Sequence, residues 1–133
     1  MRKIKFRGWD KINEKWVYGY LVKSKYHRSQ PILYSFIHTP HQKKYNKPST
    51  IIMVDANSIG QYTGLKDKNG IEIYEGDIIQ HFIFPNDNTY IVVFDDYSCA
   101  FMLENKYGRD MLSRAKNIEI IGNIHENKEM LKK

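Results

Sequence analysis

The run GQYTGLKDKNG at residues 60–70, followed by IYEGDI at residues 73–78, places two turn signals and the starts of two strands close together. Asn and Gly tolerate a positive φ, and Asp can accept a hydrogen bond from the backbone two residues further on. Gly76 occupies the position of the second turn most expected to need a positive φ. The residues assigned structural roles in these turns are Asp67, Asn69, Gly70, Gly76 and Asp77.

Strand signals continue on both sides of this motif. An apolar-Gly-Asp-apolar turn that leads into a strand is a common opening of SH3-like barrels, and short strands with regular turns follow it, at 77–84, 89–94, 99–103 and 117–124. Upstream, alternation at 4–8 and the aromatic run at 16–22 predict a hairpin, in which Gly19 indicates a bulge or a close backbone approach. Further strands are expected at 32–37 and 51–54.

These patterns predict an all-β protein. We expect an N-terminal β-meander over residues 1–59, packed on a C-terminal SH3-like barrel over residues 60–125, and a polar tail at 126–133. The aromatic content, ten Tyr, six Phe and two Trp, agrees with a strand-rich fold.

The single cysteine, Cys99, excludes an internal disulfide and a cysteine-rich zinc site. No apolar run approaches the roughly eighteen residues of a membrane-spanning helix. The basic N-terminus lacks the apolar stretch of a signal peptide. We therefore expect a soluble intracellular protein with no membrane partner.

Charge divides unevenly along the chain. Residues 1–50 hold twelve Lys and Arg against two acids, a formal charge of +10, whereas residues 51–133 hold nine against thirteen, a charge of −4. Such a split favours either a polyanionic partner for the basic half or charge-complementary contact between halves or subunits.

Two basic loops in the first half are the strongest indication of function. Lys and Arg neutralise phosphates, and Tyr interleaved with them can stack on unpaired bases. The candidate nucleic-acid-binding residues are Lys23, Lys25, Tyr26, Arg28, Lys43, Lys44, Tyr45 and Lys47. The alternatives are a merely solvated face or a surface that docks on the acidic half of a neighbouring subunit.

Catalytic and metal sites have weaker support. The best acidic group is Glu75, Asp77, His81, Asp95 and Asp96, but Asp77 and His81 would lie about 13 Å apart on one strand, and turn bracing explains the carboxylates better. No cofactor is expected, and a metal-dependent hydrolase remains a remote alternative.

The remaining chemistry-bearing side chains have ordinary explanations. Cys99 lies in an apolar run and is expected to be a small core residue. Three histidines of the basic half, His27, His38 and His41, lack zinc-ligand spacing and are expected on surface loops.

Four sequence blocks, at 4–10, 62–70, 73–78 and 118–127, resemble the YopX family of phage and prophage proteins. The blocks fall in the family's order and cover nearly the whole chain. The resemblance implies a β-rich fold with an SH3-like barrel in the C-terminal half and an origin in a bacteriophage or prophage, hence the cytoplasm of a bacterial host. It implies no activity, cofactor or catalytic residue.

Two hypotheses follow. The first is a non-enzymatic phage accessory protein that contacts nucleic acid through the basic, Tyr-containing loops. The second is a homo-oligomeric module that binds a host or phage protein.

Overall fold

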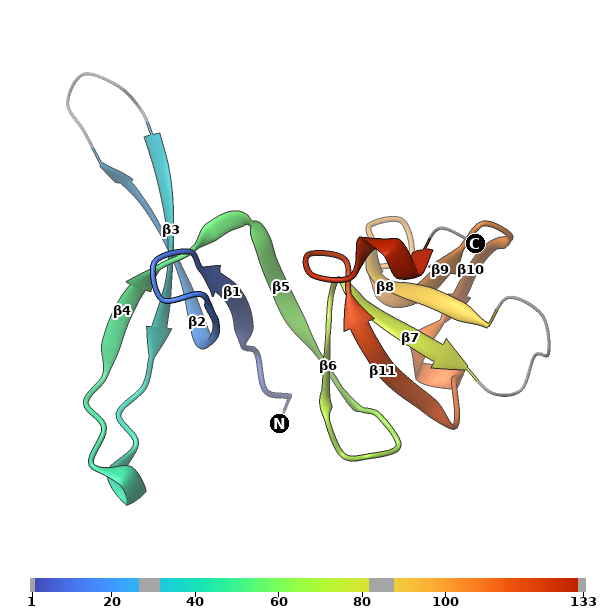
Figure 1. Cartoon of the computed structure of the whole chain (residues 1–133), viewed down its shortest axis with the longest axis horizontal. Helices are drawn as coiled ribbons and strands as arrows, with labels where there is room; N and C mark the ends of the chain where they lie inside the picture. The colour runs from blue at the N-terminus through green and yellow to red at the C-terminus, as the bar shows by residue number, and fades with distance from the viewer. Residues whose placement is uncertain (1, 27–31, 82–87, 132–133) are drawn as a thin grey trace. The chain divides into compact units, whose positions relative to one another are not determined.

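The computed structural model describes residues 2–26, 32–81 and 88–131. Within these ranges the regular elements are β-strands and three short 3₁₀ helices, with no α-helix, so the all-β prediction is confirmed (Figure 1). The chain divides into two compact units, residues 1–61 and residues 62–133, described here as unit 1 and unit 2. The sequence predicted this boundary after residue 59.

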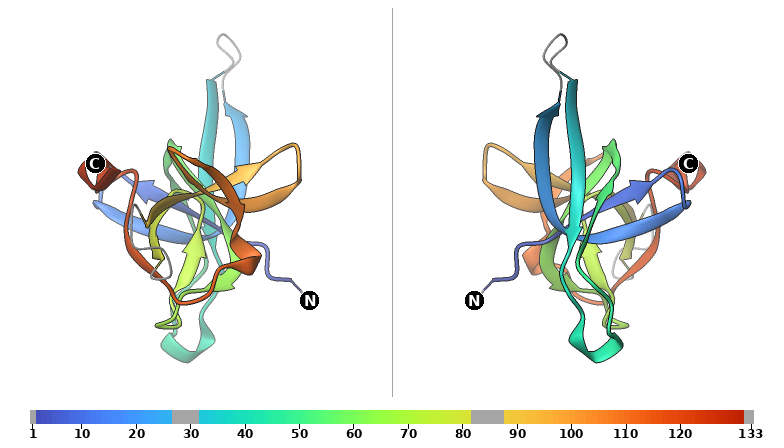
Figure 2. Two further views of the ribbon diagram at one scale, coloured as in Figure 1. Left: turned by 90° about the vertical axis from the view of Figure 1, so that its right-hand side faces the viewer. Right: turned by 90° about the vertical axis from the view of Figure 1, so that its left-hand side faces the viewer.

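Unit 1 is an antiparallel sheet in the order β4-β3-β2-β1-β5. Its first four strands form the expected meander of neighbouring hairpins, and the first half of β5 pairs with β1 on the other side. The second half of β2 and β3 run side by side as a long two-stranded ribbon (Figure 2). The strands are β1 (Phe6–Asp10), β2 (Lys15–Tyr26), β3 (Ile32–Thr39), β4 (Thr50–Met53) and β5 (Asp55–Lys66).

One face of this sheet supplies a small core. Val17, Ile37 and Val54 are buried and pack with partly buried apolar side chains of the same unit. Because successive side chains of a strand point to opposite faces, Tyr18 and Tyr20 of β2 lie on the face away from this core. Their side chains are about half exposed, at 47% and 53%.

Strand β2 changes partner along its length. Its first residues pair with β1, up to Gly19, and its pairing with β3 begins at Tyr20 opposite His38. A Cβ added to Gly19 would lie 2.1 Å from the carbonyl oxygen of His38. The predicted close backbone approach is therefore confirmed, and it marks the point from which β2 and β3 diverge.

Unit 2 contains a second antiparallel sheet, in the order β10-β9-β8-β7-β11, and β6, which pairs with the second half of β5. In the described ranges no pairing joins β10 to β11, so this sheet is open rather than a closed barrel. The strands are β6 (Glu72–Tyr74), β7 (Asp77–His81), β8 (Thr89–Asp95), β9 (Ala100–Asn105), β10 (Gly108–Met111) and β11 (Ile118–Asn123).

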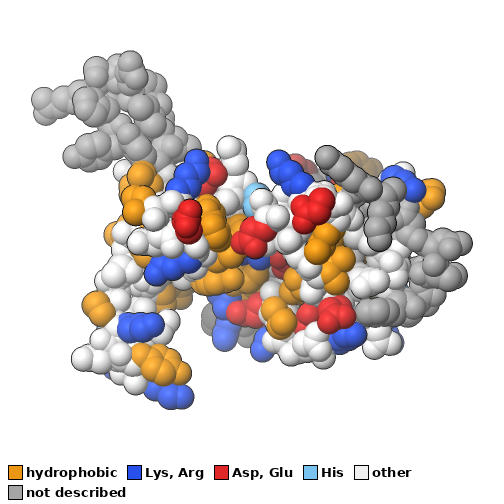
Figure 3. All heavy atoms as spheres, viewed as in Figure 1, with side chains coloured by type: hydrophobic (Ala, Val, Ile, Leu, Met, Phe, Trp, Pro, Cys, Tyr) orange, Lys and Arg blue, Asp and Glu red, His pale blue; other side chains and the backbone are white. Residues whose placement is uncertain are grey.

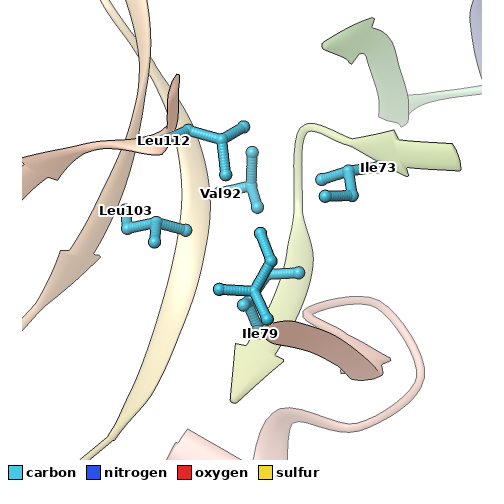
Figure 4. Packing of buried hydrophobic residues seen from close by; sticks show 6 residues of the cluster. Ile73, Ile79, Val92, Leu103 and Leu112 are labelled. Carbon is cyan, nitrogen blue, oxygen red and sulfur yellow. The ribbon is translucent and has the colours of Figure 1, made fainter. Parts of the chain in front are cut away.

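The core of unit 2 is larger than that of unit 1. Leu112 reaches it from the short 3₁₀ helix η2 (Leu112–Arg114), and the other members come from strands (Figure 4). The buried members are Ile73, Ile79, Val92, Leu103, Leu112 and Ile118. Each full burial of a Leu or Ile side chain stabilises a fold by roughly 1.5–3 kcal/mol, so this cluster is the main apolar contribution within unit 2.

Residues 62–78 of the motif begin unit 2, and their carboxylates fix the turns of the motif. The Oδ1 atom of Asp67 accepts hydrogen bonds from the backbone N–H of Asn69 at 2.9 Å and of Ile71 at 3.0 Å. Its Oδ2 atom accepts a third from Ile120 of β11 at 3.1 Å. One carboxylate thus fixes the turn and holds it against a strand about fifty residues away in sequence.

The second turn of the motif is braced in the same way. Asp77 is buried, and its Oδ2 accepts a hydrogen bond from the backbone N–H of Tyr74 at 2.8 Å. Gly70 and Gly76 have φ values of +80° and +86°, in the region that favours glycine. The turn residues of the motif therefore stabilise the fold.

In the ranges that the structure describes, no helix is both long and apolar enough to cross a membrane.

Candidate nucleic-acid interface

Positive charge is concentrated in unit 1. Residues 1–61 carry twelve Lys and Arg against three acidic residues, a formal charge of +9, and residues 62–133 carry nine against twelve, a charge of −3. A surface with this excess attracts phosphate-bearing partners over a distance of about 10 Å at moderate salt.

The basic segment at 41–48 forms an ordered turn between β3 and β4. Gln42 and Lys47 exchange two backbone hydrogen bonds, of 3.0 and 3.2 Å, around the 3₁₀ helix η1 (Lys43–Tyr45). Asn46 ends this helix in the left-handed conformation, with a φ of +49°. The turn therefore has a defined shape.

Four of the predicted binding residues lie on this η1 turn, and all four are exposed: Lys43, Lys44, Tyr45 and Lys47. The Nζ atom of Lys44 lies 5.5 Å from the centroid of the Tyr45 ring, which is itself 63% exposed. Blue and orange side chains gather at this end of the β3–β4 hairpin (Figure 3). A cation beside an exposed aromatic ring suits both a phosphate and an unpaired base.

The second basic segment lies at the other end of β3. Lys23 is exposed on β2, whereas the side chains of Lys25 and Tyr26, and all of Arg28, lie outside what the structure describes. β3 pairs with Tyr26 of β2 at one end and with Thr50 of β4 at the other, a separation of about 23 Å at ~3.3 Å per residue. The structure does not bring the two basic segments together.

A groove in unit 1 joins part of the η1 turn to residues that the sequence did not single out. It has a volume of about 490 Å³ and lies between the start of β2, the end of β3 and the start of β4. Its charged and aromatic lining residues are Lys15, Trp16, Tyr18 and Lys47. No acidic side chain lines it. The signal available in the sequence was the run KWVYG at 15–19.

The ring of Trp16 is held from two sides. Trp9 packs against it edge-on, with ring centroids 5.4 Å apart, and the Cζ atom of Arg7 lies 4.6 Å from its centroid. Arg7 is itself 5% exposed. Trp16 is therefore a fixed wall of the groove, whereas Tyr18 is more exposed.

Two of the acidic residues considered as metal ligands, Asp77 and Asp95, have structural roles. Asp95 accepts hydrogen bonds from the backbone N–H and the hydroxyl of Ser98, at 2.8 and 2.5 Å, and pairs with Arg109 at 2.5 Å. The Ser98 hydroxyl, its N–H and then Arg109 hold the pKa of the Asp95 carboxyl below its usual value. Among the described residues, no group of three His, Cys, Asp or Glu is placed to hold a metal ion.

Cys99 corrects a sequence prediction. It is exposed rather than buried, because it lies in the turn before β9 with a φ of +52°. His38 lies on β3, where its ring stacks on Tyr20 with centroids 6.2 Å apart, and His41 is exposed near the η1 turn. His27 lies outside the described residues.

The fold and the site define a class: an all-β protein of two antiparallel units, with a basic, aromatic groove on the first. The YopX family model, described as "YopX protein", matches residues 5–132, and the chain belongs to that family.

A solved structure shares the architecture. The crystal structure of protein EF1440 from Enterococcus faecalis is 24% identical and matches with a TM-score of 0.54, over 98% of this chain and 99% of that one. At this identity the similarity concerns the fold alone. No curated protein matches the chain.

Proposed function

We propose that this YopX-family protein is a phage- or prophage-encoded accessory protein, without enzymatic activity, that binds nucleic acid through unit 1 in the cytoplasm of a bacterial host. The observation that carries the proposal is the η1 turn, which presents three lysines and a tyrosine on a hydrogen-bonded frame in a unit of charge +9. We further propose that unit 2 has an SH3-like architecture and serves as a scaffold. Its meander of short strands and the antiparallel pairing of β11 with β7 support this proposal.

Salt dependence tests nucleic-acid binding. Each phosphate neutralised by a lysine contributes about 0.7–0.9 to the slope of log affinity against log salt, so replacing three contacting lysines lowers the slope by about 2–3. Fluorescence anisotropy of labelled oligonucleotides between about 50 and 200 mM salt measures this slope. The test variant replaces Lys43, Lys44 and Lys47 by Gln.

A matched control changes the net charge equally in unit 2. It replaces the exposed residues Lys106, Lys116 and Lys128 by Gln. If both triple variants lower the slope equally, the effect reflects overall charge and not the η1 turn. If neither DNA nor RNA binds at about 50 mM salt, the proposed function is wrong.

The opposite charges of the two units favour a second candidate function, a homo-oligomer that binds a host or phage protein. The basic unit of one copy would face the acidic unit of the next, and closed rings are expected because an open head-to-tail contact makes filaments. A molar mass equal to one chain in light scattering, at low salt and working concentration, would refute this candidate.

A further inference from the structure

We propose that the groove of unit 1 binds an unpaired base of single-stranded nucleic acid, with the base stacked on Tyr18 beside Trp16 and the neighbouring phosphates on Lys15 and Lys47. This inference rests on the proposed function and adds the strandedness of the ligand and the place where it binds.

The groove exists because β2 and β3 separate. Their backbones come so close at Gly19 that a Cβ there would overlap the His38 carbonyl, and the pairing recorded for the two strands stops at Tyr20. Toward its start, β2 continues with β1 alone, while β3 continues with β4. The diverging strands leave an opening, and its volume of about 490 Å³ lies within the range of small-ligand sites, roughly 300–1,000 Å³.

The walls of the groove suit a base. Trp16 is fixed by Trp9 and Arg7, and Tyr18 is 47% exposed on the same strand face two residues on. Stacking on aromatic side chains tolerates any base, because every base has a π face. A base inside a duplex has both faces covered by its neighbours, so only an unpaired base can enter.

The charges at the groove suit the phosphates that flank such a base. Lys15 lies at the start of β2 and Lys47 at the end of the η1 turn, and both are exposed. No carboxylate lines the groove. Asp10, which pairs with Lys15 across the β1–β2 hairpin and interacts with it electrostatically, accepts hydrogen bonds from the N–H groups of its own turn. Lys43 and Lys44 extend the positive charge along the η1 turn, so a strand that leaves the groove on that side meets further cations.

One experiment tests both whether the ligand is single-stranded and whether it binds in the groove. The wild-type protein is titrated with labelled oligothymidine of about 16 nucleotides and with a duplex of equal length, at low salt. Trp9 and Trp16 are the protein's two tryptophans, so a Trp9→Phe variant reports on Trp16 alone. We expect oligothymidine to bind more tightly than the duplex and to quench Trp16 fluorescence.

Tyr18→Ala should weaken oligothymidine binding by about 5- to 150-fold, the factor for losing one base–aromatic stack, and leave duplex binding unchanged. Tyr97→Ala is the control, because Tyr97 is a fully exposed tyrosine of unit 2. Its affinity for both ligands should equal that of the wild type. Unfolding midpoints of both variants, measured by circular dichroism, verify that they are folded.

Three results would overturn the inference. Equal affinity for the two ligands, unaffected by Tyr18→Ala, would mean that the basic surface binds nucleic acid without the groove, and the proposed function would survive. No binding of either ligand at low salt would remove both proposals. Conversion of an oligomer to a monomer by Tyr18→Ala in analytical ultracentrifugation would show that a second copy of the chain occupies the groove.

Discussion

The carboxylate of Asp67 should contribute measurably to stability through its bond to β11. Its Oδ1 serves two turn amides, and its Oδ2 accepts the N–H of Ile120 at 3.1 Å. Asp67→Asn keeps an acceptor for the turn but can place an NH₂ group against the Ile120 N–H. Because hydrogen bonds to charged groups contribute about 1.5–3 kcal/mol, Asp67→Asn should lower the free energy of unfolding by about that amount.

Asp67→Ala removes both acceptor oxygens, and with them all three hydrogen bonds, so it should destabilise the protein more than Asp67→Asn. The increment should be modest, about 1 kcal/mol, because water can reach the amides of an exposed turn. Urea denaturation, monitored by far-ultraviolet circular dichroism, measures both losses. The m-values should stay unchanged, because the substitutions should not alter the surface exposed on unfolding.

Asp96→Asn is the matched control for Asp67. Asp96 is exposed in the turn between β8 and β9, so its substitution should change the free energy of unfolding by less than about 0.5 kcal/mol. An Asp67→Asn loss as small as that of the control would refute the role assigned to the Oδ2 bond. A loss of the same size in Asp67→Ala and Asp67→Asn would instead show that the turn bonds contribute little.

Three further outcomes are expected. Gly19→Ala should destabilise the protein by about 1–3 kcal/mol in urea denaturation, because its methyl group overlaps the His38 carbonyl. The Asn13 side chain holds the pKa of Asp10 below its usual value, so this carboxylate stabilises the fold above about pH 4 and progressively less as the pH falls through its folded pKa. The difference in thermal midpoint between wild type and Asp10→Asn should therefore shrink from pH 7 to about pH 2. Cys99 should react with a maleimide in the native protein as completely as in urea, by mass spectrometry, because it is exposed.

Much of unit 2 was predictable because its turns contain the Gly, Asn and Asp residues that favour turns. The strands at 77–84, 89–94, 99–103 and 117–124 were expected, and β7, β8, β9 and β11 lie at those places. The exception is β10, whose four residues are all exposed. Without a buried face, such an edge strand shows no apolar alternation, so its sequence gave no strand signal.

The groove was less predictable, because it depends on which strands meet. Lys47 was recognised from its basic loop, but Tyr18 looked like one aromatic of a return strand, and no local pattern relates the two. The prediction that Cys99 is buried was wrong for a related reason. Its apolar neighbours suggested a core strand, whereas its backbone, with a positive φ, lies in the turn before that strand. Local chemistry predicts turns well, and tertiary placement decides which side chains share a site.

Strand β5 also limits how the chain length can vary. Its pairing with β1 runs up to Gln61, and its pairing with β6 begins at the next residue, Tyr62. Because strand side chains alternate, one inserted or deleted residue here would turn the partner side chains of one pairing to the wrong face. A one-residue insertion or deletion at this junction should therefore prevent correct folding. The same change should be tolerated in the exposed turn between β9 and β10, at Lys106 and Tyr107.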